Sequence, residues 1–303
     1  MSGPGAAPGP AVNGLVVIDK AAGWTSHDVV ARCRGIFGQR RVGHAGTLDP
    51  DATGVLLVGL GRVTRLLRFL SALPKTYTTD IVLGTATTTL DASGEVVATY
   101  DMGEVTPAMV HEAAASLTGE IEQVPPMVSA VKVGGRRLHE LARQGVEVER
   151  APRPVTVYRF DTAPDPERPG VYRAEVECSS GTYVRVLAHD LGLALGGAAH
   201  LANLRRTRIG SFGATDMRPL EAVEAAGPAA VLTPAEAVRD LDAVTVEPAI
   251  AVSVRRGLAL DRVPLGAVGE GPWALLDERG ALLAVYEATD SDRIRPAVVL
   301  AAG

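Results

Sequence analysis

The chain is organised around the stretch Arg41-Val42-Gly43-His44-Ala45-Gly46-Thr47-Leu48-Asp49-Pro50-Asp51-Ala52-Thr53-Gly54. This stretch is too polar for a strand and too rich in glycine for a helix, so it predicts a shaped loop. Because a residue before proline avoids the helical region, Pro50 fixes the direction of the Asp49 side chain. The apolar run at 55–60 predicts a buried strand that anchors the loop.

A rigid loop that holds one aspartate and one histidine against a core strand is what a small active site requires. Local chemistry also allows a plainer interpretation, in which Asp49-Pro50 marks an ordinary turn and His44 is a satisfied loop histidine. The remainder of the chain favours the active site.

Length and composition predict one large and one small domain around a sizeable core. The chain has 303 residues, of which 47% are hydrophobic. Cys33 and Cys178 have neither metal-ligand nor disulfide spacing, so both are expected to be buried small hydrophobic residues. Residues 1–12 are expected to be disordered, and the lack of a signal peptide or a long apolar span predicts a cytoplasmic protein.

Charge is segregated along the chain. The net charge is −5, yet residues 27–75 contain eight basic and three acidic side chains, a net of +5. Residues 221–303 contain seven basic and thirteen acidic side chains, a net of −6. A solvated face explains any one basic cluster, whereas a basic block around an Asp-His loop favours a nucleic-acid ligand.

Capping signals and periodicity predict the elements. Thr25 followed by Asp28 is a capping box that predicts a helix ending at Gly38, and Thr106-Pro107 predicts another helix start. The other expected helices are 64–70, 186–195 and a last one from Thr233-Pro234; the expected strands are 15–18, 75–83, 95–99, 171–178 and 209–212, with a Thr-rich loop at 84–94. From about residue 245, short apolar runs between Gly, Pro and acidic turns predict a small β-rich module.

Residues 123–153 are expected to form a projecting arm. Pro125-Pro126 opens it, Gly134-Gly135-Arg136-Arg137 predicts a basic tip, and 138–144 can form one short helix. Six basic and three acidic residues over 123–154 give a net charge of +3. A surface insertion that is merely tolerated is the alternative.

Arg185 lies among apolar residues where the strand at 171–178 turns into the next helix. A buried or half-buried arginine requires an anionic partner. A structural glutamate would serve, but Asp49 is the more attractive candidate.

The stretch from Gly43 to Gly54 closely resembles the bacterial TruB family of tRNA pseudouridine-55 synthases. The first motif is long and specific, and weaker motifs that resemble the family follow over residues 13–220 in the family's order. These are Asn13-Gly14 through Asp19-Lys20 with Gly23, Lys75-Thr76-Tyr77, the run 125–132, Gly181-Thr182-Tyr183-Val184-Arg185 and Leu204-Arg205-Arg206-Thr207.

The resemblance implies an α+β fold, with a mixed and largely antiparallel sheet flanked by helices and a thumb-like insertion. It implies a catalytic pseudouridine synthase domain at 13–243, an RNA-gripping arm at 123–153 and a small β-rich PUA-like domain at 244–303. The short acidic tail is similar to the reduced tail of actinobacterial members, whereas other members have a full RNA-binding PUA domain.

The resemblance also implies the chemistry. Asp49 would be the nucleophile, attacking C6 of the base or C1′ of the ribose, or it would instead remove a sugar proton. Arg185 would pair with Asp49 and keep it ionised, and Tyr77 would stack on the target base and could serve as acid or base. Leu204 would form part of an apolar wall, and Lys20 would support the pocket. Because the isomerisation involves no redox change, no cofactor and no metal are expected.

Uridine 55 lies inside the folded T loop of tRNA, so the resemblance implies base flipping. His44 would occupy the vacated stack while the arm clamps the T-arm and elbow of the tRNA. Binding should weaken steeply with salt because basic residues would contact phosphates, namely Arg40, Arg41, Arg62, Arg65, Arg68, Arg136 and Arg137. A monomer without an obligate protein partner and without membrane association is expected.

Three other functions fit the same residues. An RNA-remodelling chaperone, or in the extreme a non-catalytic RNA-binding module, would open the tRNA elbow without depending on the chemistry. A synthase that acts on another RNA would modify a different uridine. A hydrolase built on Asp49 and His44 would release uracil or cleave RNA.

Overall fold

A computed structural model of the chain describes residues 11–127, 132–133, 136–137, 144, 146, 148–289 and 292–300. The chain divides into two compact units, one formed by Met1–Ser71 with Gly210–Gly303 and the other by Ala72–Ile209. Within the described residues, no helix is both long and apolar enough to cross a membrane.

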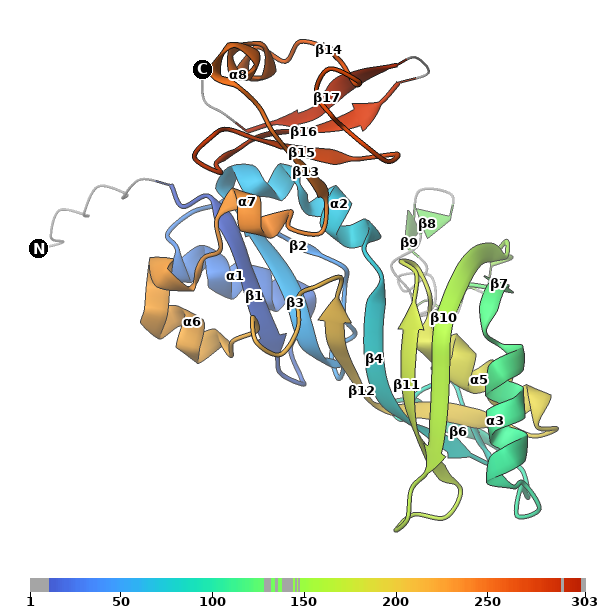
Figure 1. Ribbon diagram of the computed structural model, residues 1–303. Helices are drawn as coiled ribbons and strands as arrows, with labels where there is room; N and C mark the ends of the chain where they lie inside the picture. Colours follow the sequence, from blue (N-terminus) through green and yellow to red (C-terminus); the bar gives the residue numbers. More distant parts are fainter. Residues whose placement is uncertain are drawn as a thin grey trace, which may run out of the picture. The chain divides into compact units, whose positions relative to one another are not determined.

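The N-terminal part of the first unit contains strands β1, β2 and β3 (Figure 1). β1 (Gly14–Lys20) pairs antiparallel with β3 (Thr53–Leu60) over its whole length, and β2 (Val42–Ala45) pairs antiparallel with residues 57–60 of β3. The strands expected at 15–18 and 55–60 are therefore confirmed, each slightly longer than its apolar run.

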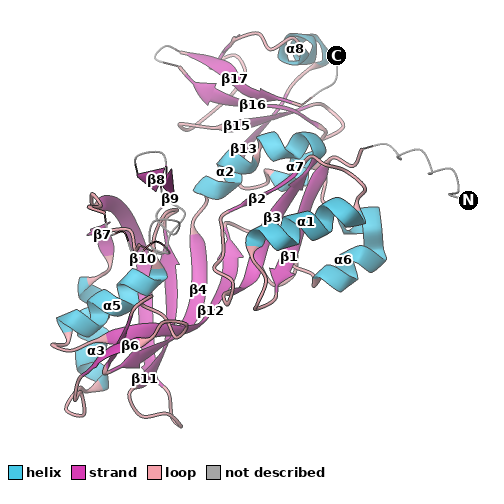
Figure 2. Cartoon of the chain, turned by 180° about the vertical axis from the view of Figure 1, so that it is seen from behind, coloured by secondary structure: helices cyan, strands magenta, loops and turns pink. Residues whose placement is uncertain are grey.

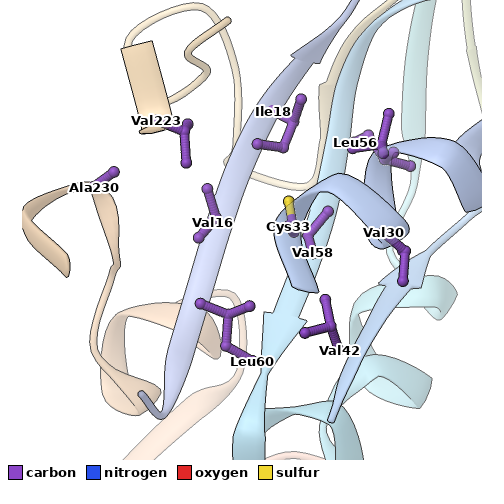
Figure 3. Packing of buried hydrophobic residues seen from close by; sticks show 11 residues of the cluster. Val16, Ile18, Val30, Cys33, Val42, Leu56, Val58, Leu60, Val223 and Ala230 are labelled. Atoms are coloured by element: carbon purple, nitrogen blue, oxygen red, sulfur yellow. The ribbon is translucent and has the colours of Figure 1, made fainter. Parts of the chain in front are cut away.

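Helix α1 (Ser26–Ile36) covers this small sheet and closes its core. Its capping box is confirmed, since the Thr25 hydroxyl accepts from the Asp28 N–H at 3.1 Å and the Asp28 carboxylate accepts from the Thr25 N–H at 2.9 Å. Figure 3 shows the core between helix and strands, with Cys33 of α1 among residues of β1, β2 and β3.

Two short helices replace the single helix expected at 64–70. Residues Gly61–Arg65 form a 3-10 turn, η1, and α2 follows at Leu67–Ala72. Tight three-residue hydrogen bonds, from Leu66 N to Val63 O at 2.8 Å and from Phe69 N to Leu66 O at 3.0 Å, separate the two.

The chain returns to the first unit after residue 209 and packs beside β1. Helix α6 (Leu220–Ala226), the 3-10 turn η2 (Gly227–Ala230) and α7 (Pro234–Ala237) follow one another, and Leu15 N bonds to Leu232 O at 2.9 Å. The helix start at Thr233-Pro234 is confirmed by a capping box with Glu236, although α7 is only one turn long.

The small β-rich C-terminal module is confirmed as a five-stranded sheet in the order β13–β15–β16–β17–β14. Its strands are β13 (Asp242–Thr245), β14 (Leu260–Asp261), β15 (Trp273–Leu276), β16 (Leu282–Ala288) and β17 (Arg293–Val299). The expectation that the helix at Thr233 is the last one was wrong, because α8 (Pro248–Arg255) buries Ala251 and Val254 at helical spacing against this sheet.

The second unit is a five-stranded antiparallel sheet in the order β12–β4–β11–β10–β7. Its strands are β4 (Lys75–Leu83), β7 (Gly119–Gln123), β10 (Arg153–Pro164), β11 (Val171–Cys178) and β12 (Ala199–Ile209). The strands expected at 75–83 and 171–178 are confirmed, and β10 is a strand that the pattern did not predict.

The strand expected at 209–212 was wrong in its bounds. The observed strand, β12, ends at Ile209, and the basic run from Leu204 to Arg208 lies inside it instead of preceding it. The reason is that Arg206 is fully buried, so one inward position of this strand is a cation and the apolar alternation is hidden.

Two helices lie side by side on one face of this sheet, α3 (Pro107–Ser116) and α5 (Val184–Ala194) (Figure 2). Thr106 caps α3 as expected. Helix α5 approaches β12 very closely at Gly192, where an added Cβ would lie 2.2 Å from the Ala199 nitrogen.

Two small hairpins complete the second unit. β6 (Val96–Thr99) confirms the strand at 95–99, and it pairs with β5 (Thr85–Thr87) inside the segment expected to be a loop. In the arm, β8 (Lys132–Val133) pairs with β9 (Arg136–Arg137). The helix expected at 138–144 lies outside the described residues except for Gln144, and the disorder expected at 1–12 concerns a segment outside them except for 11 and 12.

Candidate active site

The Asp49 loop, residues 46–52, connects β2 to β3. The expectation of a loop from residue 41 was wrong for 42–45, because these residues form strand β2, which pairs with β3. Gly46 begins the loop with a φ of 77°, a conformation that suits glycine. Asp49 is half-buried between the buried side chains of Leu48 and Ala52.

Lys20 holds the loop from β1. Its ammonium group is buried and donates hydrogen bonds to the carbonyls of Ala21 at 3.0 Å, Trp24 at 2.6 Å and Pro50 at 2.8 Å. The Gly23 N–H reaches the same Pro50 carbonyl at 3.0 Å. Lys20 therefore ties the residue directly after Asp49 to the first strand.

Ser26 holds the residue on the other side of Asp49. The Leu48 N–H donates to the Ser26 hydroxyl at 2.9 Å, and this hydroxyl lies 3.3 Å from the Leu48 carbonyl oxygen. The backbone on both sides of Asp49 is thus anchored, which is the preorganisation that a catalytic carboxylate requires.

Lys20→Met is expected to lower the free energy of unfolding by about 3 kcal/mol, because three carbonyl groups lose a charged donor in a buried setting. Urea unfolding measures this difference. The matched control is Arg32→Met on the exposed face of α1, whose surface ion pair with Glu224 should contribute less than about 1 kcal/mol. Equal losses in the two variants would contradict a special role for Lys20.

His44 lies on β2 opposite Val58, close to the Asp49 loop. Its ring meets the ring of His27 edge to face, with the centroids 5.5 Å apart and the planes at 83°. Arg40 and Arg41 precede β2 and are exposed, and the Arg41 guanidinium donates to the Thr64 hydroxyl at 3.0 Å. The structure therefore brings together His44, Lys20 and Asp49 in the first unit.

Three arginines that were expected to contact RNA donate hydrogen bonds to the C-terminal module. Arg62 donates to the Leu300 carbonyl at 2.9 Å, Arg65 donates to the Val299 carbonyl at 2.6 Å, and Arg68 donates to the Glu287 carboxylate at 2.8 Å. Part of the basic segment at 27–75 therefore contacts the acidic C-terminal module. Local sequence gives no sign of this contact, because the partners lie more than two hundred residues away.

Tyr77 lies on β4 of the second unit, where it is buried opposite Val176 of β11 and Arg206 of β12. Lys75 is buried two residues earlier on the same face. Burial, together with the positive charge of Arg206, lowers the pKa of Lys75 to about 8. Tyr77 therefore shares one face of the sheet with two buried basic side chains.

Arg185 lies in the first turn of α5 and is buried, as expected. Its guanidinium donates to the Thr89 carbonyl at 3.0 Å and lies 3.4 Å from the Asp91 carboxylate. The sequence reasoning missed Asp91, because it lies in a Thr-rich segment 94 positions from Arg185. The sequence signal that could have indicated Asp91 was a single aspartate in a segment rich in threonine. In the structure, the hydroxyls of Thr89 and Ser93 donate hydrogen bonds to the Asp91 carboxylate at 2.6 and 2.5 Å.

Leu204 is half-buried on β12, at a position where this strand shifts register against β4. Arg136 and Arg137 form β9 of the arm, and their side chains lie outside the described part of the chain. Asp49 belongs to the first unit, whereas Tyr77, Arg185 and Leu204 belong to the second. The pairing of Asp49 with Arg185 stays a prediction.

The two thiols are poor nucleophiles. Cys33 and Cys178 are buried and not disulfide-bonded, as expected, and burial raises the pKa of each thiol to about 11. Asp49, by contrast, is half-buried in a loop that is anchored on both sides of it.

Comparison with known proteins identifies the family. The TruB family pseudouridylate synthase N-terminal domain matches residues 34–184, and the tRNA pseudouridylate synthase B C-terminal domain matches residues 185–244. The chain is 46% identical over 284 residues to the tRNA pseudouridine synthase B of Arthrobacter sp. (strain FB24), covering 90% of this chain and 92% of the relative. It is 49% identical over 279 residues to that of Nocardia farcinica (strain IFM 10152), covering 91% of this chain and 90% of the relative.

A solved structure also has a similar fold. A chain in the crystal structure of a Cbf5-Nop10-Gar1 complex matches with a TM-score of 0.73 and 27% identity, covering 92% of this chain and 79% of that chain. The expected fold class, a mixed and largely antiparallel sheet flanked by helices with a small PUA-like module at its C-terminal end, is confirmed. This protein belongs to the TruB family of pseudouridylate synthases.

Proposed function

We propose that this enzyme converts uridine 55 in the T loop of tRNA to pseudouridine, with Asp49 as the nucleophile. The isomerisation of tRNA uridine follows from its family and from tRNA pseudouridine synthase B relatives that share nearly half of its residues. The observation that carries the choice of Asp49 is the Asp49 loop itself, anchored by Lys20 on one side and by Ser26 on the other.

The proposed chemistry needs only side chains of this chain. The Asp49 carboxylate forms a covalent adduct with the flipped uridine, the glycosidic C–N bond breaks, and C5 of the turned uracil bonds to C1′ of the sugar. The bond to Asp49 then breaks, C5 loses its proton to water, and N1 gains a proton. Attack at C6 of the base and attack at C1′ of the ribose both fit these residues, as does an initial removal of a sugar proton by Asp49. Arg185 is proposed to keep Asp49 ionised, and Tyr77 to stack on the base.

The proposed RNA contacts explain how an enclosed uridine becomes accessible. His44, held edge to face by His27, fills the gap that the flipped base leaves in the T loop. The arm at 123–153 clamps the T-arm, with Leu204 in the wall of the pocket. As part of this proposal, the enzyme acts as a monomer in the cytoplasm on the elbow of tRNA.

The direct test uses T-arm RNA with tritium at C5 of uridine 55 only. Formation of pseudouridine releases this tritium to water, so wild-type enzyme should release nearly all of it. The same RNA with tritium at a different T-loop uridine is the control. Tritium release from the control RNA, and not from the RNA labelled at uridine 55, would reject uridine 55 as the target. Release from neither RNA would reject the proposed synthase activity.

The salt dependence of RNA binding tests which arginines contact phosphates. Arg40→Ala should reduce the slope of log K against log [salt] by about 1, because one phosphate contact is lost. Arg68→Ala is the matched control and should leave the slope unchanged, since this guanidinium binds Glu287. Filter binding between about 50 and 200 mM salt measures both slopes. A larger change for Arg68 would reverse the assignment.

A further inference from the structure

The strand β12 breaks its register with β4 at Asn203 and Leu204. Ala202 lies opposite Asp80 and Arg205 lies opposite Thr78, so two residues of β12 face the single residue Thr79. This is a β-bulge, and Asn203 has a φ of 52°. Among residues other than glycine, asparagine is one of the few that adopt this left-handed conformation readily.

Side chains of β4 hold the bulge on both sides. The Thr79 hydroxyl donates to the Ala202 carbonyl at 2.7 Å, and the Asn203 side-chain amide donates to the Asp80 carboxylate at 2.8 Å. Asp80 is buried and forms an ion pair with Arg168 at 2.8 Å. The bulge is thus part of a hydrogen-bonded network rather than an irregularity at the end of a strand.

The bulge decides which side chains of β12 share the face of Tyr77. Residues directly opposite one another on paired strands point to the same face, so Arg206 shares the face of Tyr77 and Arg205 shares that of Thr78. Alternation along β12 then places Leu204 on the face of Tyr77. With no extra residue, the register would move by one, and Leu204 would point to the opposite face.

We propose that Asn203, held by Asp80, is a positioning residue whose bulge turns Leu204 toward Tyr77 and thereby builds one wall of the uridine pocket. This inference rests on the proposed function, which assigns Tyr77 and Leu204 to that pocket. Asp80 and Asn203 act from the opposite face of the sheet and do not contact the substrate. Their effect on the reaction passes through the orientation of Leu204.

The test compares two substitutions at one position. Asn203→Gly keeps the left-handed backbone and loses only the amide, whereas Asn203→Val disfavours the left-handed backbone because valine is β-branched. In single-turnover reactions with T-arm RNA, Asn203→Val should slow pseudouridine formation by about 10²-fold, the size expected for a misplaced pocket wall, while Asn203→Gly should slow it much less. The Kd for RNA should change little in either variant.

Charge exchange provides a rescue experiment. Asn203→Asp places two carboxylates 2.8 Å apart and should slow the reaction, while the double variant Asp80→Asn/Asn203→Asp restores one donor and one acceptor and should recover most of the rate. A residue with a merely structural role would give rate losses that follow the melting temperature. Equal rates for Asn203→Val and Asn203→Gly, or no recovery in the double variant, would overturn the proposal.

A readout without RNA separates this proposal from the function on which it rests. In protein with labelled leucine methyl groups, a nuclear Overhauser effect between Leu204 and the Tyr77 ring is expected in wild type and in Asn203→Gly, and its loss is expected in Asn203→Val. Its absence in wild type would overturn the inference even if uridine 55 is modified. Its presence in an enzyme that forms no pseudouridine would reject only the proposed function.

Discussion

Asp49→Asn is expected to reduce pseudouridine formation by at least about 10³-fold, because the amide cannot form the covalent adduct that a carboxylate nucleophile forms. Binding of T-arm RNA should stay within a few fold of wild type, since Lys20 and Ser26 hold the loop backbone on both sides of Asp49. Single-turnover tritium release and filter binding measure the two quantities on the same preparations.

Asp51→Asn is the matched control for this variant. It removes a carboxylate from the same loop, two residues away, at an exposed position. Its rate should stay close to that of wild type. If both variants lose activity equally, the loss reflects the charge of the loop and not a nucleophile at Asp49.

The same experiment separates the other functions that fit these residues. An RNA chaperone would retain its RNA-folding effect in Asp49→Asn. An isomerase would instead lose its product, pseudouridine, in this variant. A hydrolase would release free uracil or cleaved RNA in wild type, which chromatography of the products detects. Pseudouridine mapping in a deletion strain would reveal a different RNA target if uridine 55 stayed modified.

Arg185→Met is expected to slow the reaction by about 10²- to 10³-fold, because it removes a buried, fixed positive charge from the proposed pocket. If Arg185 keeps Asp49 ionised, the acid limb of the pH–rate profile should move to higher pH in this variant. Arg185→Lys should recover only part of the rate, since an ammonium group lacks the planar fork that reaches both the Thr89 carbonyl and Asp91.

Two further variants make this result specific. Arg208→Met removes an exposed guanidinium from β12 and should leave both the rate and the pH profile unchanged. Asp91→Asn should give a smaller loss, of about tenfold, because it removes a charge beside Arg185 but leaves the guanidinium in place. A pH profile that does not move in Arg185→Met would contradict the pairing with Asp49.

Local signals predicted much of the fold because they depend on residues only a few positions apart. Thr25, Thr106 and Thr233 each cap a helix where the sequence places one, and the alternating run at 75–83 is strand β4. The apolar alternation did not predict a strand correctly where a polar side chain is buried. Arg206 is a buried cation in β12, so the apolar alternation of this strand is interrupted and the strand was expected several residues too late.

The candidate site shows the same division. The motif around Asp49 and the buried position of Arg185 were readable from the sequence, and both are consistent with the described geometry. The contacts of Arg62, Arg65 and Arg68 were not readable from the sequence, because their partners belong to a module more than two hundred residues further along the chain. A basic residue is recognisable from sequence, but the distant group to which it donates a hydrogen bond is not.

The sequence by itself determined the family, the Asp49-Pro50 loop ahead of a buried strand and the starts of the main helices, since sterics and capping act between near neighbours. Only the tertiary structure decided that Asp91 neighbours Arg185 and that Asn203, bound to Asp80 over a separation of 123 residues, shifts the register of β12. The physical reason is that strand register and ion pairing depend on which distant segments meet. A shift of one residue exchanges the faces of the side chains that follow, in β12 as far as the next register shift, between Arg206 and Arg208.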